Sequence, residues 1–245
     1  MKADLLGITI DFMPYEDLII KIFQKGYKTI TYANQYVLNE AFTNEKLRSD
    51  LSKFDLIHSD GIGVQKAFKY LYDKNTSRVT GSDMYYKLFD ILNQKSLSIF
   101  IFGSTQNVLE SSIKFINERF PQIIIKGSKN GFSNLSDPEI VKEINLSNSD
   151  FLFVGLGTPK QESWIVENKD ILQVDKIISI GGGLRVITGD RKRGPVFIQK
   201  LGLEWMVRLV EEPVKNFQRY IVGIPLFLYR IIKQKSNNEL KLINS

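Results

Sequence analysis

Short apolar runs rich in isoleucine, valine and phenylalanine alternate along this chain with longer segments of helical period. Two of the runs, "LSIFIF" and "DFLFVGL", are almost continuously apolar, which is typical of parallel strands that are buried on both faces. The alternation predicts an α/β fold with a mostly parallel, Rossmann-like sheet that is flanked by helices. The expected strands are Leu5–Ile10, Thr29–Ala33, Asp55–His58, Ser98–Gly103, Gln122–Lys126, Phe151–Gly155 and Lys176–Ile180.

The segments between these strands are expected to be helices, and two of them open on a proline, as first turns often do. Beyond Gly189 the pattern is helical only, which places a boundary near residue 195. We therefore expect an α/β catalytic domain over residues 1–195 and a helical C-terminal appendage over residues 196–245. The expected helices of the first part are Pro14–Lys25, Gln35–Leu51, Gly63–Tyr72, Asp83–Asn93, Gln106–Phe120, Pro138–Leu146 and Lys160–Glu167.

Composition excludes several kinds of chemistry. The chain has no cysteine, so disulfides and thiolate nucleophiles are excluded, and its single histidine, His58, rules out a multi-histidine metal site. The N-terminal segment reaches the acidic Asp4 too early for a signal peptide. No apolar run approaches the roughly 18 residues of a membrane span. We expect a cytoplasmic protein with no transmembrane helix.

Basic charge is concentrated at the C-terminal end. The net charge is +6, and residues 191–245 hold eleven lysines and arginines but only four acidic residues. Apolar and aromatic residues are interleaved with these cations, a pattern typical of an amphipathic segment at a membrane interface. We expect this segment to bind an anionic membrane surface. The alternatives are a solvated basic helix end, or apolar residues that pack on the sheet or on a second copy of the chain.

Glycine-containing turns follow four of the expected strands: "HSDGIG", "FGSTQN", "GLGTPKQE" and "IGGGLRVITG". Ligands of open α/β sheets bind beyond the carboxyl ends of the strands, where glycines let backbone N–H groups approach an anion. Four such turns at one edge favour a nucleotide or diphosphate site, with Gly103, Ser104, Gly155 and Gly157 as candidate contacts. The alternative is that tight strand-to-helix turns need these glycines for packing alone.

The motifs narrow the kind of nucleotide site. The P-loop pattern does not occur, and the dinucleotide fingerprint is incomplete because Lys160 stands at its third glycine position. Asp175 precedes its strand instead of ending it, so it is badly placed to bind a ribose. The Asp-x-Asp pair that holds a metal in many sugar transferases is absent. We expect no metal and no cofactor, with arginines, lysines and backbone N–H groups neutralising a diphosphate.

Six blocks of the sequence resemble the WecG/TagA/CpsF family of bacterial glycosyltransferases. The resemblance runs from about residue 3 to residue 235, and its most specific part is "GLGTPKQE-x-W" followed by "GLEW". The blocks are "YANQYVLNEA" (32–41), "SDGIGV" (59–64), "RVTGSD" (78–83), "FVGLGTPKQESW" (153–164), "GLEWMVRLVEEP" (202–213) and "RY" (219–220).

This resemblance implies an inverting, metal-independent transfer of a sugar from a UDP-sugar. The implied acceptor is a sugar linked through diphosphate to a polyprenol, at the inner face of the cell membrane. Products of the family feed teichoic acid, enterobacterial common antigen, capsule and exopolysaccharide synthesis. N-Acetylmannosamine transfer to polyprenyl-diphosphate N-acetylglucosamine is the best-known reaction, and other members use glucose or N-acetylmannosaminuronate.

Two residues are candidates for catalysis. Asp60 follows a buried-type strand, so its carboxylate should project at the sheet edge, and it matches the base proposed for the family. The alternative is that Asp60 caps the helix after Gly61. His58 shares a strand face with Asp60, but a lone histidine at a strand end is more often structural. The resemblance places Arg78 near the acceptor or the diphosphate.

The block that begins with "GLGTPKQ" supplies further candidates. Pro159 is expected to set the turn into a helix, near whose start Lys160 could bind a diphosphate and Gln161 a base or sugar. Glu162 complements the dipole of that helix. Trp164 is expected in the core and not as a stacking platform.

Two other parts of the chain complete the predicted site. Asn34 and Gln35 match a polar block of the family at the sugar-binding cleft, and Tyr32 is included although a small polar residue often stands there. In the C-terminal appendage, Arg208 and Arg219 are eleven residues apart, about three helical turns, so they would share a face of a continuous helix. Arg208, Lys215 and Arg219 are predicted to bind the UDP diphosphate, with Lys215 in place of a usual arginine. 

Two other functions remain open from the residues alone. A nucleotide-binding oxidoreductase of Rossmann type is disfavoured by the missing third glycine, and quenching of NADH fluorescence would support it. A nucleic-acid-binding module would use the basic appendage, but no recognised motif accompanies it, so we expect no nucleic acid partner. Salt-dependent retention on DNA would support that function. A homo-oligomer is also compatible with the sequence.

Overall fold

The structure is a computed structural model that describes residues 1–76, 81–134, 136–188 and 194–243. In these residues one sheet has the strand order β6-β5-β7-β8-β3-β4-β2-β1-β9. Every neighbouring pair from β6 to β2 is parallel, whereas β1 runs antiparallel to both β2 and β9. The strands are β1 Lys2–Leu5, β2 Ile8–Asp11, β3 Thr29–Ala33, β4 Leu56–Ser59, β5 Ser98–Gly103, β6 Ile124–Lys129, β7 Phe151–Gly155, β8 Lys176–Ser179 and β9 Leu242–Ile243.

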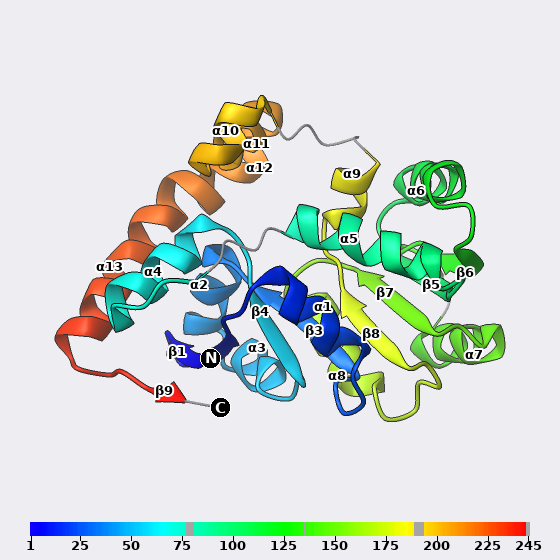
Figure 1. Ribbon diagram of the computed structural model, residues 1–245, viewed down its shortest axis with the longest axis horizontal. Helices are drawn as coiled ribbons and strands as arrows, with labels where there is room; N and C mark the ends of the chain where they lie inside the picture. The colour runs from blue at the N-terminus through cyan, green and yellow to red at the C-terminus, as the bar shows by residue number, and fades with distance from the viewer. Residues whose placement is uncertain (77–80, 135, 189–193, 244–245) are drawn as a thin grey trace.

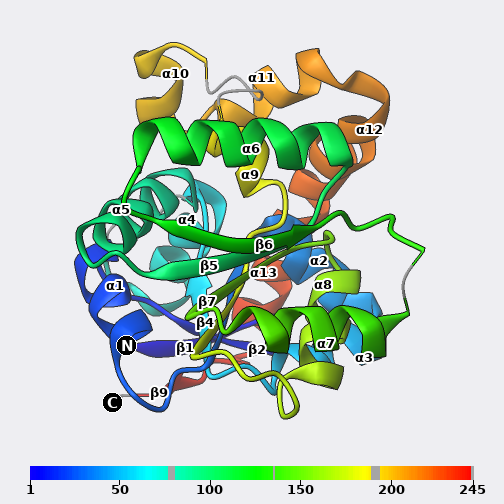
Figure 2. The same ribbon diagram turned by 90° about the vertical axis from the view of Figure 1, so that its right-hand side faces the viewer.

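Helices cover both faces of this sheet, which confirms the predicted α/β class (Figure 1). Figure 2 shows α6 on one side of β5 and β6, and α7 on the other. The helices are α1 Tyr15–Phe23, α2 Gln35–Thr43, α3 Glu45–Leu51, α4 Ile62–Tyr72, α5 Gly81–Gln94, α6 Gln106–Arg119, α7 Asp137–Ser147, α8 Lys160–Asn168, α9 Gly183–Ile187, α10 Val196–Leu201, α11 Glu204–Glu211, α12 Pro213–Phe217, the π-helix η1 Gln218–Val222 and α13 Gly223–Ser236.

The continuous apolar strands are explained by two separate cores. In β5, Phe100 and Phe102 point into the core beneath α2, α3, α4, α7, α8 and α13. Ile99 and Ile101 point into the opposite core, which is built with α1, α5, α6 and α9. Because successive side chains of a strand alternate between faces, a strand between two helical layers must be apolar at every position.

Three local expectations are wrong. The predicted strand Leu5–Ile10 is a hairpin of β1 and β2, because Leu6 and Gly7 have φ of 55° and 83° and reverse the chain. The predicted helix Gln35–Leu51 divides at Asn44, whose side chain accepts a hydrogen bond from the Leu47 N–H and so starts a new helix. The C-terminal part is not purely helical, because β9 pairs with β1.

The last helix, α13, returns along the body and packs beside α2 and α4 (Figure 1). Its Phe227 and Ile231 are buried in the same core as the helices beneath it. The Arg230 guanidinium donates to the Asn39 carbonyl at 3.0 Å, and the Asn39 amide donates to the Gly223 carbonyl at 2.7 Å. These contacts hold α13 against α2. The boundary near residue 195 stays a prediction.

Candidate active site

A cavity of about 250 Å³ lies where β3, β4 and β8 end, at the edge predicted to bind ligands. The helices α10, α11 and α12 lie at the end of the molecule at which β8 leads into α9 (Figure 1). Residues from the strand ends form one wall of the cavity, and residues from the C-terminal helices form the other. The lining residues are Tyr32, Asn34, Gln35, Asp60, Gly61, Ile62, Gly63, Tyr85, Ile180, Gly182, Gly183, Val186, Gly202, Glu204, Trp205, Arg208, Arg219, Tyr220, Ile224, Phe227 and Leu228.

Asp60 is placed in this cavity by the end of β4. Its backbone N–H donates to the Ala33 carbonyl at 2.9 Å, which continues the pairing of β4 with β3. The helix that follows is N-capped by Gly61 at φ 86°, without a side-chain hydrogen bond at the cap. The N-cap residue itself is therefore Gly61 and not Asp60. The half-buried Asp60 carboxylate lines the cavity instead.

Asn34 orients that carboxylate. Its Oδ1 accepts from the backbone N–H groups of Tyr36 and Val37, both at 3.1 Å, and so caps α2. With the amide oxygen held in this way, Nδ2 faces Asp60 and donates to its Oδ2 at 3.3 Å. The start of α2 and the end of β4 therefore share one polar contact at the cavity wall.

Two arginines face the cavity from the C-terminal helices. Burial acts to lower the pKa of Arg208, but its interactions with Tyr220, Asp60 and Glu204 outweigh burial, so the pKa is raised. The Arg219 guanidinium lies over the Tyr36 ring, 4.6 Å from its centroid. In the described structure the Nε atom of Arg219 is buried and has no hydrogen-bond partner. The cavity thus sets the positive charges of Arg208 and Arg219 beside the Asp60 carboxylate.

The π-helix η1 supplies both Arg219 and its neighbour Tyr220 to the cavity. Single π-helical turns inside helices are frequent at functional sites. The Tyr220 ring is buried 6.0 Å from the ring of Trp205, centroid to centroid. Arg230 does not line the cavity, and its guanidinium lies over the ring of Phe42 on α2, 4.2 Å from the ring centroid.

His58 lies behind the cavity wall and does not line it. Its Nδ1 is 3.1 Å from the Ser59 carbonyl. Burial lowers the pKa of His58 more than the nearby carboxylates of Asp60 and Asp11 raise it. A neutral imidazole bonded to the backbone of its own strand agrees with the structural interpretation of this residue.

Tyr32, Gln161 and Glu162 form a buried polar group beside the cavity. The Gln161 amide donates to Glu162 Oε1 at 2.8 Å and lies 3.5 Å from the Tyr32 hydroxyl. Burial, assisted by the Glu162 charge, raises the pKa of Tyr32 to about 12. Burial also raises the pKa of Glu162, which Thr158 contacts at 3.1 Å. Only Tyr32 of this group lines the cavity.

The turns after β5 and β7 lie apart from the cavity lining. A Cβ atom at Gly103 would overlap the backbone of Gly155, so these paired strand ends need glycine to approach each other. The Ser104 N–H donates to the Gly155 carbonyl at 2.9 Å. These contacts favour the packing alternative for this pair of turns.

The remaining candidates of the "GLGTPKQ" block also lie away from the cavity lining. Gly157, at φ 79°, and Pro159 form the turn into α8, and Lys160 is exposed at the first residue of that helix. Trp164 is buried against Phe102 at 4.9 Å between ring centroids, which confirms its prediction as a core residue.

Two candidates have no described side chain. Arg78 lies outside the described residues. Lys215 lies on α12, and only its place on that helix is described.

The prediction missed several cavity residues. Trp205 and Tyr220 stand inside the quoted blocks "GLEW" and "RY", so the signal was present. Tyr85 carried no such signal. It reaches the cavity from α5 because its hydroxyl donates to the Ser179 carbonyl at 2.8 Å. Only the packing of α5 against the end of β8 brings it there.

Comparison with known proteins identifies the family. A sequence model described as "Glycosyl transferase WecG/TagA/CpsF family" matches residues 3–241. This chain belongs to that glycosyltransferase family. It is 31% identical over 240 residues to the N-acetylglucosaminyldiphosphoundecaprenol N-acetyl-beta-D-mannosaminyltransferases of Staphylococcus aureus strains MW2 and NCTC 8325 / PS 47. Each match covers 96% of this chain and 93% of the relative.

As a WecG/TagA/CpsF glycosyltransferase, the protein is an enzyme, and the oxidoreductase alternative is not favoured. Within the described ranges, no group of three or more aspartate, glutamate, histidine or cysteine side chains is arranged to hold a metal ion. None of the helices described is both long and apolar enough to cross a membrane.

Proposed function

We propose that the protein transfers N-acetylmannosamine, or a related hexose, from a UDP-sugar to a polyprenyl-diphosphate-linked sugar, with inversion and without a metal ion. The activity of its Staphylococcus aureus relatives, as their names state it, suggests the sugar and the class of acceptor. The single observation that carries the proposal is the shared cavity of Asp60, Arg208 and Arg219, which joins a base to two cations.

In this mechanism Asp60 is the general base. Its carboxylate takes the proton of the acceptor hydroxyl while that oxygen attacks the anomeric carbon from the face opposite UDP. The bond between the anomeric carbon and the β-phosphate oxygen breaks, and its electron pair leaves with UDP. Asn34, through its 3.3 Å contact, keeps the Asp60 carboxylate aimed into the cavity.

Arg208 and Arg219 neutralise the departing diphosphate. Their guanidinium groups stay charged at every relevant pH and present several donors to phosphate oxygens. Arg219 has a buried Nε without a partner among the described residues, and Tyr36 supports its guanidinium. Cations that are already in place stabilise the charge that develops on UDP, which is the role a metal plays in other transferases.

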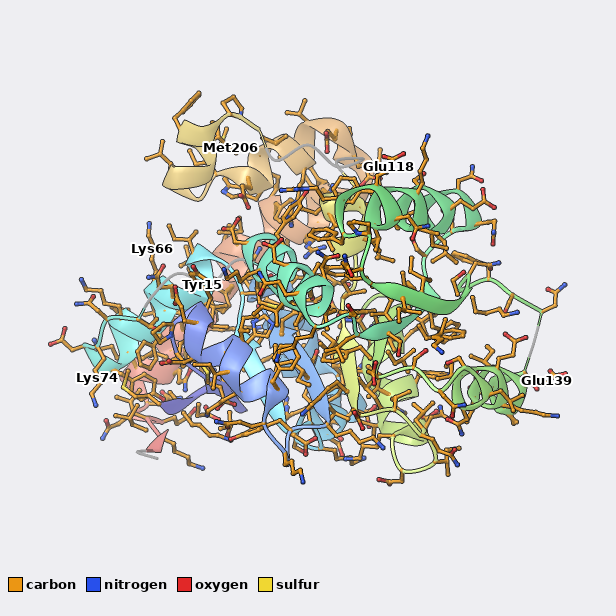
Figure 3. The ribbon with its side chains drawn as sticks, turned by 45° about the vertical axis from the view of Figure 1, so that its right-hand side comes forward. Tyr15, Lys66, Lys74, Glu118, Glu139 and Met206 are labelled. Atoms are coloured by element: carbon orange, nitrogen blue, oxygen red, sulfur yellow. The ribbon has the colours of Figure 1, made fainter. Side chains whose placement is uncertain are left out.

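The C-terminal helices are proposed to bind an anionic membrane at its inner face. A set of apolar side chains is exposed along them, and Figure 3 shows Met206 on their outer part. Basic residues between these side chains each contribute about 1 kcal/mol near an anionic leaflet. The exposed apolar residues are Phe197, Leu201, Met206, Val210, Val214, Phe217, Ile221, Val222, Leu226, Leu228, Tyr229 and Ile232.

This placement brings the cavity to the surface where a polyprenol-linked acceptor resides. It fits an enzyme of cell-surface polysaccharide or teichoic acid synthesis. A homo-oligomer that buries the same apolar residues is the competing outcome. 

Vesicle co-sedimentation separates the two outcomes. Val214→Glu together with Phe217→Glu should reduce binding to phosphatidylglycerol vesicles at least about tenfold, because two exposed apolar contacts become charged. Exchange of the exposed Phe132, in the turn after β6, for glutamate is the matched control and should leave binding unchanged. If the double variant still binds vesicles but is a monomer where the wild-type protein is a dimer, these apolar residues form a subunit interface and do not bind the membrane.

The reaction is tested by offering a panel of UDP-sugars with a short-chain polyprenyl-diphosphate N-acetylglucosamine acceptor. Product mass identifies the sugar, and the anomeric proton coupling in the product reports retention or inversion. Turnover should persist in EDTA. Complete loss in EDTA that magnesium restores would contradict the metal-free mechanism, and the absence of transfer from every UDP-sugar would reject the proposed reaction.

A further inference from the structure

Tyr32 lies between the cavity and a buried amide that the cavity does not reach. Tyr32 lines the cavity, whereas Gln161 is completely buried and does not. The Tyr32 hydroxyl is 3.5 Å from the Gln161 Nε2 atom. The phenol ring therefore closes the cavity on the side of α8.

The glycine after β8 makes room for this ring. A Cβ atom at Gly181 would overlap the Tyr32 hydroxyl and would also come within 3.7 Å of Gln161 Oε1. The Tyr32 hydroxyl, the Gln161 amide and the Gly181 backbone thus meet in one place. Tyr32 is held there by strand β3 on one side and by this close fit on the other.

Two side-chain oxygen atoms near the Tyr32 ring lack hydrogen-bond partners among the described residues. Among the described residues, Gln161 Oε1 and Glu162 Oε2 are buried and have no hydrogen-bond partner. Buried acceptors of this kind are uncommon in folded proteins and call for an explanation. Both atoms belong to the polar group of Tyr32, Gln161 and Glu162, of which only Tyr32 lines the cavity.

The side of the substrate that meets Tyr32 follows from the proposed base. Asp60 must contact the acceptor hydroxyl beside the anomeric carbon, so the donor hexose lies next to Asp60. Tyr32 and Asp60 line the same wall, formed by the ends of the adjacent strands β3 and β4. C2 is bonded directly to the reacting anomeric carbon, so a side chain on the wall beside Asp60 is within reach of the C2 substituent.

We propose that Tyr32 is a specificity-determining residue, whose ring limits the size of the C2 substituent that the donor sugar can carry. This inference rests on the proposed transfer from a UDP-sugar. Removing the ring would open the cavity to the Gln161 amide oxygen, which can accept a hydrogen bond from an acylamino N–H group. Removing only the hydroxyl would leave the wall in place.

The test compares UDP-N-acetylhexosamine with its N-butanoyl analogue as donors. The wild-type protein should discriminate against the longer acyl chain. Tyr32→Thr should reduce that discrimination, measured as the ratio of the two kcat/KM values, by about tenfold or more, the size expected for adding or removing methylene groups in a pocket. Tyr32→Phe should retain the wild-type ratio. Tyr70→Thr, a matched change at an exposed tyrosine of α4 that does not line the cavity, should also retain it.

The outcomes separate this inference from the proposed function. If the wild-type protein transfers the sugar but Tyr32→Thr has the same ratio of kcat/KM values for the two donors, the role of Tyr32 is overturned. The proposed reaction is not affected by that result. Failure of the wild type to use any UDP-sugar would instead overturn the reaction. Titration calorimetry with UDP alone should give the same affinity for all variants that fold.

If the Tyr32→Thr variant does not fold, a larger side chain at position 32 provides a second test of the proposal. Tyr32→Trp narrows the cavity, so it should lower kcat/KM for the N-acetyl donor relative to a donor with a free 2-hydroxyl group by about tenfold. An unchanged ratio in this variant would likewise overturn the proposal.

Discussion

The carboxyl edge of the sheet has two halves that look alike in sequence and differ in structure. At the ends of β5 and β7, Gly103 and Gly155 let two backbones approach each other. At the end of β8, Gly181 and Gly183 leave room for side chains of other elements, because Cβ atoms there would overlap Tyr32 and Tyr85. Both of these tyrosines line the cavity.

The difference teaches that a glycine turn after a strand is not by itself a binding site. In one half glycine serves backbone packing, and in the other half it shapes a cavity from side chains that come from β3 and α5. The proposed chemistry belongs to the second half, where Asp60 and the two arginines meet. Substitutions in each half therefore test the comparison.

The largest effect is expected at Asp60. Asp60→Asn removes the proposed base but keeps the size of the side chain, so transfer should fall about 10²–10⁴-fold. UDP-sugar affinity, measured by titration calorimetry, should remain within about threefold because the arginines are unchanged. Asp90→Asn, an exposed change on α5, is the matched control. Undiminished turnover of Asp60→Asn would place the base elsewhere.

A smaller effect on transfer is expected at Gly181. Gly181→Ala introduces a Cβ atom into the space of the Tyr32 hydroxyl, so Tyr32 must move. Displacement of a cavity wall should lower kcat/KM on the order of tenfold, with a Tm change of only a few degrees. The measurement is steady-state kinetics combined with thermal unfolding. Wild-type kinetics in this variant would show that the position of Tyr32 does not matter for transfer.

In the other half, the same kind of substitution should affect stability instead of chemistry. Gly103 has φ 130° and no room for a Cβ atom, so Gly103→Ala should destabilise the fold by about 2–3 kcal/mol. For a domain of this size the Tm should fall by about 5–10 °C. Activity per folded molecule, assayed well below Tm, should stay at the wild-type value. If Gly103→Ala kept the wild-type Tm but lost UDP binding, the ends of β5 and β7 would have to be part of the ligand site.

The smallest effect is expected at Lys160. This exposed residue at the start of α8 lies apart from the cavity lining, so Lys160→Ala should change kcat/KM by less than about threefold. Arg219→Ala provides the comparison, because loss of a cation inside the cavity should cost about a hundredfold. A larger loss at Lys160 than at Arg219 would reverse the assignment of the diphosphate to the C-terminal helices.

Much of the fold could be predicted because local patterns of apolar residues indicate the strands and helices. Continuous apolar runs identified β5 and β7, since both faces of each strand are covered by helices. The β1–β2 hairpin escaped prediction because its turn places Leu6 at a positive φ, which a leucine seldom adopts. The division of the helix at Asn44 also escaped, because a capping asparagine inside a periodic stretch looks like an ordinary polar residue.

The candidate site was predicted unevenly for a similar reason. Tyr32, Asn34, Gln35, Asp60, Arg208 and Arg219 do line one cavity. Gly103, Gly155 and Lys160 were proposed from the same kind of motif, yet they lie outside its lining. A glycine motif after a strand indicates a tight turn, but it does not indicate which other parts of the chain pack against that turn.

The order of residues alone determined the class of fold and the family, because apolar periodicity and motif spacing are local properties of the chain. Only the tertiary structure decided which half of the sheet edge holds the cavity. That decision depends on α13 packing beside α2 and α4, with Phe227 and Ile231 buried in the core, which carries Arg208 and Arg219 back to Asp60 from the other end of the chain. Contacts between residues so far apart in sequence follow from burial of apolar surface in three dimensions, and no local pattern records them.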